Sequence, residues 1–248
     1  MRPIQTALSV IEAIGRLQPA GVSEIARDLD LPKSTIQRAL KALSQAGWIE
    51  TISGERGAWS LSLEAGVAVG RADFATRRLR MTAIPVMEEL RRRTNESVYL
   101  AVRHKRQIAL IERLDGINPV VHAWPLWQAG PMHSTSLGKA ILSTMIEEEL
   151  DDYLSQPLHA ATARTVTDPD KLRLELTEAS KRGFATSFQS NWPDENGVGA
   201  AIRNNRGAAF AAISISAPVN RVSAEDCLAM GDLLVDAARR ISLGLARL

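Results

Sequence analysis

The segment that most constrains this chain, residues 21–47, predicts two short helices joined by a tight turn. In the first helix Ser23 is a suitable N-cap, and Glu24 places a carboxylate in the first turn, where the helix dipole favours it. Pro32 follows the turn, near a helix start, where its missing N–H group costs least. The second helix, over residues 33–46, places apolar side chains at helical spacing, which predicts one buried face.

The other face of this second helix is polar and carries no acidic residue. A helix of this length fits the major groove of DNA, where Gln and Arg side chains read base edges while Lys and Ser side chains contact phosphates. Most charged helix faces are only solvated, but the helix-turn-helix spacing and the lack of acids favour DNA. The residues predicted to contact DNA are Lys33, Ser34, Thr35, Gln37, Arg38 and Lys41.

The segments on either side complete a winged helix-turn-helix. Residues 4–18 have the apolar spacing of an amphipathic helix, and two strands are predicted over residues 48–52 and 58–63, the second with Trp59, Leu61 and Leu63 on one face. The turn between the strands is the wing. Its tip residue Arg56 is predicted to contact a phosphate or the minor groove, with an ordinary solvated turn residue as the alternative.

Changes in the pattern divide the chain into a DNA-binding domain over residues 1–64, a linker helix over 65–80 and a second domain over 81–248. The linker has few large apolar residues, which suits a connecting helix. The second domain mixes helices with strands and is predicted to be α+β, mainly an antiparallel sheet surrounded by helices. Its strands are predicted over 97–103, 107–113, 120–124, 198–203 and 209–216, and its helices over 84–94, 138–145, 170–182 and after Ser223.

Composition and motifs exclude several other classes. The single cysteine, Cys227, excludes an internal disulfide and a Cys-based zinc site, and its apolar helix stripe predicts burial. No apolar run approaches the ~18 residues that span a membrane, so we expect a cytoplasmic protein with no membrane partner. The four histidines lack metal-ligand spacing, and neither a Gly-x-Ser-x-Gly elbow nor a Walker A loop occurs. We therefore expect no catalytic residues, no metal, no cofactor and no enzymatic activity.

Three segments together carry a family resemblance: LPKSTIQRALKAL, PMHSTSLGKAIL and AAISISAPVNRVS. In this order they resemble the IclR family of bacterial transcriptional regulators, and the resemblance extends from Ile4 to about Leu245. It implies a winged helix, a linker helix and a GAF-like effector-binding domain. It also implies a homodimer or homotetramer on double-stranded, palindromic operator DNA near its own gene.

The resemblance further implies an effector pocket with two walls. One is the loop and helix start over residues 133–138, where Ser134, Ser136 and Leu137 are the expected ligand-facing positions. The other is a strand with Ser214 and Ser216, which share one face because side chains alternate along a strand. Hydroxyls and the N–H groups of a helix start suit a small organic acid. The alternative is that these serines only cap a helix or face water.

Two features of this sequence are distinctive against the family pattern. The loop over residues 190–197 is unlike the usual acidic stretch, and whether it contacts the ligand is open. His122 and Trp124 lie two apart on a predicted strand, and an aromatic wall there would favour an aromatic or cyclic acid. The alternative for Trp124 is the core or a dimer interface.

The sequence therefore predicts a ligand-responsive DNA-binding regulator that senses a small organic acid and controls a catabolic operon. Its predicted partners are operator DNA, the effector and further copies of the chain. An alternative is a small-molecule-binding or catalytic domain whose winged helix only mediates protein contacts. A third possibility is a regulator that stays bound to DNA and has a vestigial pocket. The effector, the operator, the direction of regulation and the choice between dimer and tetramer are left open.

Overall fold

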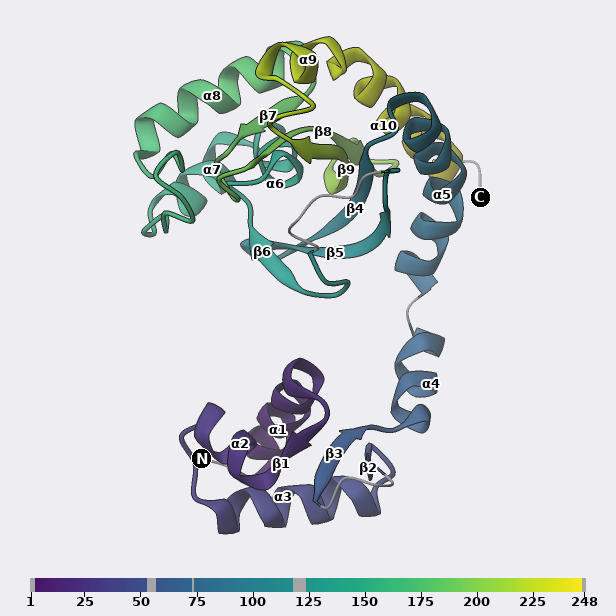
Figure 1. The fold of residues 1–248 in the computed structure, drawn as a ribbon, viewed down its shortest axis with the longest axis vertical. Helices are drawn as coiled ribbons and strands as arrows, with labels where there is room; N and C mark the ends of the chain where they lie inside the picture. The colour runs from purple at the N-terminus through teal and green to yellow at the C-terminus, as the bar shows by residue number, and fades with distance from the viewer. Residues whose placement is uncertain (1–2, 53–56, 73, 118–123, 247–248) are drawn as a thin grey trace. The chain divides into compact units, whose positions relative to one another are not determined.

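The computed structural model describes residues 3–52, 57–72, 74–117 and 124–246, and Figure 1 shows its helices and strands. The contacts within the chain divide it into two compact units, residues 1–74 and 75–248. Within the described ranges, no helix is both long enough and apolar enough to cross a membrane.

The smaller unit is a winged helix-turn-helix, as the sequence predicts. Three helices enclose an apolar core whose members include the fully buried Ile14, Ile25 and Ile36, and a three-stranded sheet completes the unit. Its elements are α1 (Pro3–Leu17), β1 (Ala20–Gly21), α2 (Val22–Asp28), α3 (Lys33–Gln45), β2 (Ile49–Thr51), β3 (Ala58–Leu61) and α4 (Leu63–Ala72).

Two local predictions for this unit are wrong. Ser23 lies inside α2, whose N-cap is Gly21 and receives no side-chain cap. The reason is the two-residue strand β1, whose Ala20 pairs with Trp59, so that the chain passes directly from sheet to helix. Leu63 begins α4 and is 76% exposed, so it does not continue the apolar face of β3.

The larger unit contains a six-stranded sheet in which every neighbouring pair is antiparallel, in the order β6-β5-β4-β9-β8-β7. Alternation along the strands sends Leu100 and Ile213 into one core and Tyr99 and Ala101 into another, on the opposite face. The strands are β4 (Ser97–His104), β5 (Gln107–Leu114), β6 (Ala129–Pro131), β7 (Ala185–Phe188), β8 (Glu195–Arg203) and β9 (Ala209–Pro218).

Helices cover both faces of this sheet (Figure 1). The three that pack on the Leu100 side are α5 (Phe74–Thr94), α9 (Ala224–Ala229) and α10 (Gly231–Ala246). The three that pack on the Tyr99 side are α6 (Ser136–Leu142), α7 (Glu147–Leu154) and α8 (Pro169–Arg182). This arrangement confirms the predicted α+β fold. The predicted helix ends at Gly183, in the left-handed region with φ 82°, and at the Ser223–Asp226 capping box are also confirmed.

Several helix limits in the larger unit differ from the prediction. The expected end of the linker helix at residue 80 falls inside α5, which continues because Leu79 and Ala83 are both fully buried in one core. The helix predicted to reach Met145 ends at Leu142. The single last helix is instead two helices, α9 and α10, separated at Met230.

Some strand predictions also need correction. Trp124 lies in no strand, residues 120–123 lie outside the described part of the chain, and the edge strand of the sheet is β6 instead. Strand β8 starts at Glu195, so part of the loop predicted over 190–197 belongs to the sheet. Neither α7 nor β7 is predicted from the sequence. The four-residue β7 is too short to show a periodic pattern.

The start of α6 packs directly against the sheet, because β8 has glycine at the two positions that face Ser136. A Cβ atom at Gly199 would lie 3.0 Å from the Ser136 carbonyl oxygen and 3.2 Å from that of Ile213. At Gly197 a Cβ atom would lie 2.9 Å from the Ser136 hydroxyl oxygen. A side chain at Gly199 meets backbone atoms and requires the backbone to shift, whereas one at Gly197 meets a serine hydroxyl.

We therefore expect Gly199→Val to destabilise the larger unit by about 1–3 kcal/mol, because the added side chain collides with backbone atoms. Urea unfolding followed by circular dichroism measures this. The control is Gly66→Ala in α4, where an added Cβ atom has nothing within 4 Å and should not destabilise the protein. Equal unfolding midpoints for Gly199→Val and the wild type would contradict the close approach.

Candidate functional site

The first candidate surface is the outer face of α3. Its inner face is buried through Ile36, Leu40 and Leu43, which leaves the residues predicted to contact DNA on the other side. Lys33, Ser34, Gln37, Arg38 and Lys41 are exposed, and Thr35 is half-buried. The sequence thus places all six on one accessible helix face.

The charges around α3 leave this face cationic. Lys33, Arg38 and Lys41 form no ion pair with any residue in the described ranges, whereas the nearby acid Asp28 of α2 is paired with Arg16 of α1 at 2.6 Å. The first turn of α3 contains no acid. This surface can therefore offer cations and hydrogen-bond donors to a phosphate backbone. Arg56, the predicted wing contact, lies outside the described residues.

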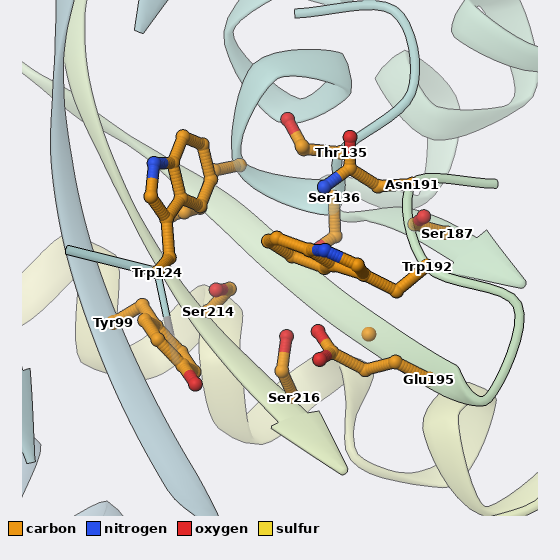
Figure 2. A pocket seen from close by; sticks show the side chains of 12 residues that line it. Tyr99, Trp124, Thr135, Ser136, Ser187, Asn191, Trp192, Glu195, Ser214 and Ser216 are labelled. Atoms are coloured by element: carbon orange, nitrogen blue, oxygen red, sulfur yellow. The ribbon is translucent and has the colours of Figure 1, made fainter. Parts of the chain in front are cut away.

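The second candidate site is a pocket in the larger unit, between the sheet and the start of α6 (Figure 2). The space outside the atoms in this concavity is about 370 Å³, a volume that includes open solvent. Two indoles and a phenol supply apolar surface, and hydroxyls, an amide and a carboxyl supply polar groups. The lining residues are Tyr99, Trp124, Thr135, Ser136, Leu137, Ser187, Asn191, Trp192, Glu195, Gly197, Ser214 and Ser216.

The sheet supplies the floor of this pocket. In the register of β4 and β9, Tyr99 pairs with Ser214, and Ser216 pairs with Gly197 of β8. Ser214 and Ser216 are only 1% and 8% exposed, so the alternative in which they face water is wrong. Their neighbours Ile213 and Ile215 point into the opposite core, as strand alternation requires.

The start of α6 supplies one side. The Thr135 hydroxyl caps this helix by accepting a hydrogen bond from the Gly138 N–H at 3.1 Å, so the capping role belongs to Thr135 and not to Ser134 or Ser136. Ser136 is left to line the pocket beside Leu137. The Ser134 hydroxyl does not line the pocket but donates to the Asn191 side-chain oxygen at 2.8 Å.

The loop from Gln189 to Glu195 supplies a further side of the pocket, and its Asn191 contacts the segment that precedes α6. It is closed by a hydrogen bond from the Gln189 N–H to the Glu195 carbonyl at 2.9 Å. Two hydroxyls from a distant segment hold its backbone: Thr162 donates to the Gln189 carbonyl at 2.7 Å and Thr165 to the Ser190 carbonyl at 2.6 Å. These contacts fix the segment that carries Asn191 and Trp192 into the pocket.

The two indoles in the pocket touch each other. Their ring centroids are 5.7 Å apart with an interplanar angle of 71°, an edge-to-face arrangement. Trp124 is 7% exposed and packs closely on Gly130, where an added Cβ atom would lie 2.1 Å from its ring. Trp124 is therefore both a core residue and a pocket residue, so both interpretations of it from the sequence hold in part.

Glu195 places a carboxyl group in the buried lining of this pocket. It is 9% exposed, and burial raises the pKa of its carboxyl to about 7, although the Ser216 hydroxyl donates a hydrogen bond to it. The nearby Asp194 raises this pKa further. Burial also raises the pKa of the Tyr99 phenol, and the charge of Glu195 adds to that shift. The described lining contains no Lys, Arg or His that could neutralise the carboxylate.

Several buried polar atoms of this pocket have no hydrogen-bond partner. They are the Tyr99 hydroxyl oxygen, the Ser214 hydroxyl oxygen and one carboxyl oxygen of Glu195. An unpaired buried polar group costs about 1–3 kcal/mol, and native proteins keep few of them. Such a cluster inside one concavity is typical of a site that is completed by a ligand.

The sequence found only part of this pocket. Trp124, Ser136, Leu137, Ser214 and Ser216 lie in its lining, and their contact with an effector stays a prediction. Ser134 does not line the pocket but donates a hydrogen bond to Asn191, which does. His122 lies outside the described residues. The sequence left open whether the 190–197 loop takes part, and this loop supplies Asn191, Trp192, Glu195 and Gly197; the lining residues that the sequence missed are Tyr99, Thr135 and Ser187.

Other groups that could carry chemistry are accounted for by the fold. Cys227 is 1% exposed in the core, and burial raises the pKa of its thiol to about 12, as its predicted helix stripe implies. In the described ranges no group of three or more His, Cys, Asp or Glu side chains is arranged to hold a metal ion.

Comparison with known proteins identifies the family. The model described as "Bacterial transcriptional regulator IclR C-terminal" matches residues 74–243, and the "IclR helix-turn-helix domain" model matches residues 3–53. The chain belongs to the IclR family. It is thus a ligand-responsive, DNA-binding transcriptional regulator whose partners are DNA and a small-molecule effector, as the sequence predicts.

Named relatives agree with this assignment. The HTH-type transcriptional repressor AllR of Escherichia coli (strain K12) is 34% identical over 228 residues, 91% of this chain and 83% of AllR. The transcriptional repressor IclR of the same organism is 28% identical over 225 residues, 90% of this chain and 81% of IclR. Among solved structures, an IclR homologue from Microbacterium hydrocarbonoxydans in complex with 4-hydroxybenzoate matches with a TM-score of 0.85 and 27% identity, covering 98% of both chains.

The raised pKa of Glu195 predicts that this residue destabilises the unliganded protein at neutral and alkaline pH. Between the ordinary carboxyl value of 4.5 and about 7, the unfolded chain releases the proton while the folded chain retains it, so stability falls as pH rises through this window. We expect Glu195→Gln to stabilise the larger unit at pH 8 by up to about 3 kcal/mol, and much less at pH 5.

Urea unfolding of both proteins at pH 5 and pH 8 measures this effect. The matched control is Glu148→Gln, at an exposed carboxyl of α7, which should leave the wild-type pH dependence in place. If Glu195→Gln loses as much stability between pH 5 and pH 8 as the wild type, the carboxyl of Glu195 is not the group that titrates.

Proposed function

We propose that this regulator reads operator DNA with the outer face of α3 and is controlled by a small organic acid with an aromatic or cyclic body, bound in the pocket beneath α6. The observation that carries the proposal is one chain with two parts: a winged helix whose exposed α3 face is cationic, and a buried pocket lined by indoles and unpaired polar atoms. On this basis residues 1–64 bind DNA, 65–80 connect, and 81–248 bind the effector and oligomerise.

The roles on α3 follow from side-chain chemistry. Gln37 and Arg38 have the donors and acceptors to read base edges in the major groove. Lys33, Ser34, Thr35 and Lys41 flank them on the same face and suit phosphate contacts, which position the helix without reading sequence. Acids on this face would favour the alternative in which the winged helix only binds proteins, and none is present.

The effector proposal rests on the lining and on one relative. Trp124, Trp192 and Tyr99 give the pocket flat apolar walls, which suit the faces of a ring. Ser136, Ser214 and Ser216 offer hydroxyls to polar substituents of such a ring. The structural relative that binds 4-hydroxybenzoate makes aromatic acids the first compounds to test.

Control of DNA binding requires two arrangements of the subunits that bind the effector with different affinities. A homodimer or homotetramer would present two α3 helices to two half-sites of a palindromic operator. The effector shifts the balance between arrangements only as far as its affinities for them differ. We propose that the target operon is catabolic, that the protein acts in the cytoplasm where its DNA lies, and that it has no enzymatic activity.

The DNA-binding proposal predicts that Arg38→Ala weakens operator binding by about 10- to 100-fold, because a base-edge contact contributes about 1–3 kcal/mol. Fluorescence anisotropy with a duplex from immediately upstream of the gene measures the affinity, and a scrambled duplex measures its specificity. The control is Arg206→Ala, at an exposed arginine in the turn between β8 and β9, which should bind like the wild type. An unchanged affinity of Arg38→Ala would remove this residue from the interface.

The effector proposal predicts a separation of two functions in Ser214→Ala. Because the Ser214 hydroxyl has no partner in the protein, its removal should not destabilise the fold or weaken operator binding. The concentration of effector that releases the operator should rise about 2- to 10-fold. The compounds are aromatic and short-chain organic acids, with 4-hydroxybenzoate among them.

The control for this variant is Ser143→Ala, whose hydroxyl donates to the Ala140 carbonyl at the end of α6 and lies outside the pocket. It should respond to effector like the wild type. Operator release by Ser214→Ala at wild-type effector concentrations would exclude the Ser214 hydroxyl from the effector site.

A further inference from the structure

The polar groups of the pocket set a requirement on its ligand that goes beyond size and shape. The unpaired oxygens of Tyr99, Ser214 and Glu195 come from β4, β9 and β8, which are neighbouring strands of one sheet. Tyr99 is directly opposite Ser214 in the register, and Ser216, the next residue on that face, donates to Glu195. The three unpaired groups therefore lie on one face of the sheet in the lining of one pocket, and we call them the polar patch.

The ionisable side chains that line this patch are acidic, and Arg113 of β5, which is opposite Tyr99 in the register, is paired with Asp115 at 2.9 Å. Glu195 and Tyr99 are the ionisable residues among the described lining, and the charged neighbour that acts on Glu195 is another acid, Asp194. A ligand carboxylate directed at Glu195 would meet a like charge in a buried site, which is strongly unfavourable. The group that can complete this patch is instead a donor to the free carboxyl oxygen.

The hydroxyls beside Glu195 make the match more specific. Tyr99 and Ser214 can each donate to an acceptor, so a ligand group that both donates and accepts can satisfy them as well. A hydroxyl or an amide-type N–H group does this, whereas a methyl group or a halogen does not. Figure 2 shows Glu195 and Ser216 on one side of the Trp192 indole and Thr135 and Asn191 on the other.

We propose that the effector carries a hydroxyl or N–H group that donates a hydrogen bond to the carboxylate of Glu195, and that any carboxylate of the effector lies away from this residue. This inference rests on the proposed effector site and narrows the class of ligand that it accepts. Glu195 thereby selects ring compounds with a polar hydrogen over rings of the same shape without one.

The proposal fixes the sign of the pH dependence. A donor binds the ionised carboxylate, so affinity rises between pH 6 and pH 8 as Glu195, whose pKa lies at about 7, loses its proton. A ligand that instead presented an acceptor would bind protonated Glu195, and its affinity would fall over the same range. The groups that act on Glu195 directly are Asp194 and Ser216, and its charge acts on Tyr99, which the Arg113 and Asp115 charges also reach from the β5 side.

The test is direct binding to the full-length protein by isothermal titration calorimetry, with matched pairs of rings. The 3- and 4-hydroxybenzoates and 4-aminobenzoate carry a donor, and the 3- and 4-methylbenzoates and 4-fluorobenzoate match them in shape without one. We expect the donor compounds to bind the wild type at least about tenfold more tightly. We also expect their affinity to be higher at pH 8 than at pH 6.

Two variants locate the preference. Glu195→Met keeps the length of the side chain but removes the acceptor, so the tenfold preference should fall close to one. Glu195→Gln keeps an acceptor oxygen without the charge, and should retain part of the preference but lose its pH dependence. Urea unfolding of both variants verifies that they are folded before binding is measured.

The proposal is overturned if methyl and hydroxyl rings bind equally, if the preference survives in Glu195→Met, or if no donor ring binds at millimolar concentration. Operator release measured in parallel separates this inference from the proposed function. Donor selectivity without operator release would refute ligand control of DNA binding and leave the ligand class in place. Operator release by rings that lack a donor would refute the ligand class and leave the regulatory function in place.

Discussion

The close approach of α6 to the sheet is the constraint on which the pocket depends. Gly197 and Gly199 remove the side chains that would separate them, so the backbone of Ser136 lies against β8 and its hydroxyl reaches the same space as that of Ser216. A larger residue at Gly199 would meet the backbone of Ser136 and Ile213 and would force α6 and the sheet apart. The glycines thus determine the size of the site, while the residues around them determine its chemistry.

The polar groups of the pocket lower the stability of the unliganded protein. A buried carboxyl with no cationic partner among the described residues, and hydroxyls without partners, all favour unfolding of the free protein. Apolar residues of similar volume would remove this cost. Neighbouring polar groups show that the fold can satisfy such atoms, since Thr162, Thr165 and Ser134 each donate to the loop that carries Trp192. The unpaired patch at Glu195 is therefore better explained by binding than by packing.

The regular elements and the residues on them could be predicted, because periodicity is a local signal. Ser214 and Ser216 share a face in any strand, and the inner stripe of α3 follows from a spacing of three and four residues. The place of Trp192 could not be found in this way, because the loop that carries it is held by hydrogen bonds from the distant Thr162 and Thr165. Glu195 was not found because its position depends on the pairing of β8 with β9. The N-cap at Gly21 was missed for a related reason, since it depends on pairing between β1 and β3, about forty residues apart in sequence.

The distribution of charge determines how much coupling free energy the effector must supply to change operator binding. The chain has a formal net charge of only +2, so general attraction to DNA is weak, and binding depends on where the cations of α3 are placed. In the proposed dimer, Lys33 and Lys41 would provide few phosphate contacts, and base reading by Gln37 and Arg38 would provide much of the preference for the operator. A complex held in this way is sensitive to the spacing between the two helices, because base contacts require close register.

A coupling of about 1–3 kcal/mol, typical of allosteric proteins, then changes operator affinity by about 5- to 150-fold. One or two hydrogen bonds formed in only one arrangement supply that amount, which is what a ligand that satisfies the Glu195 patch can provide.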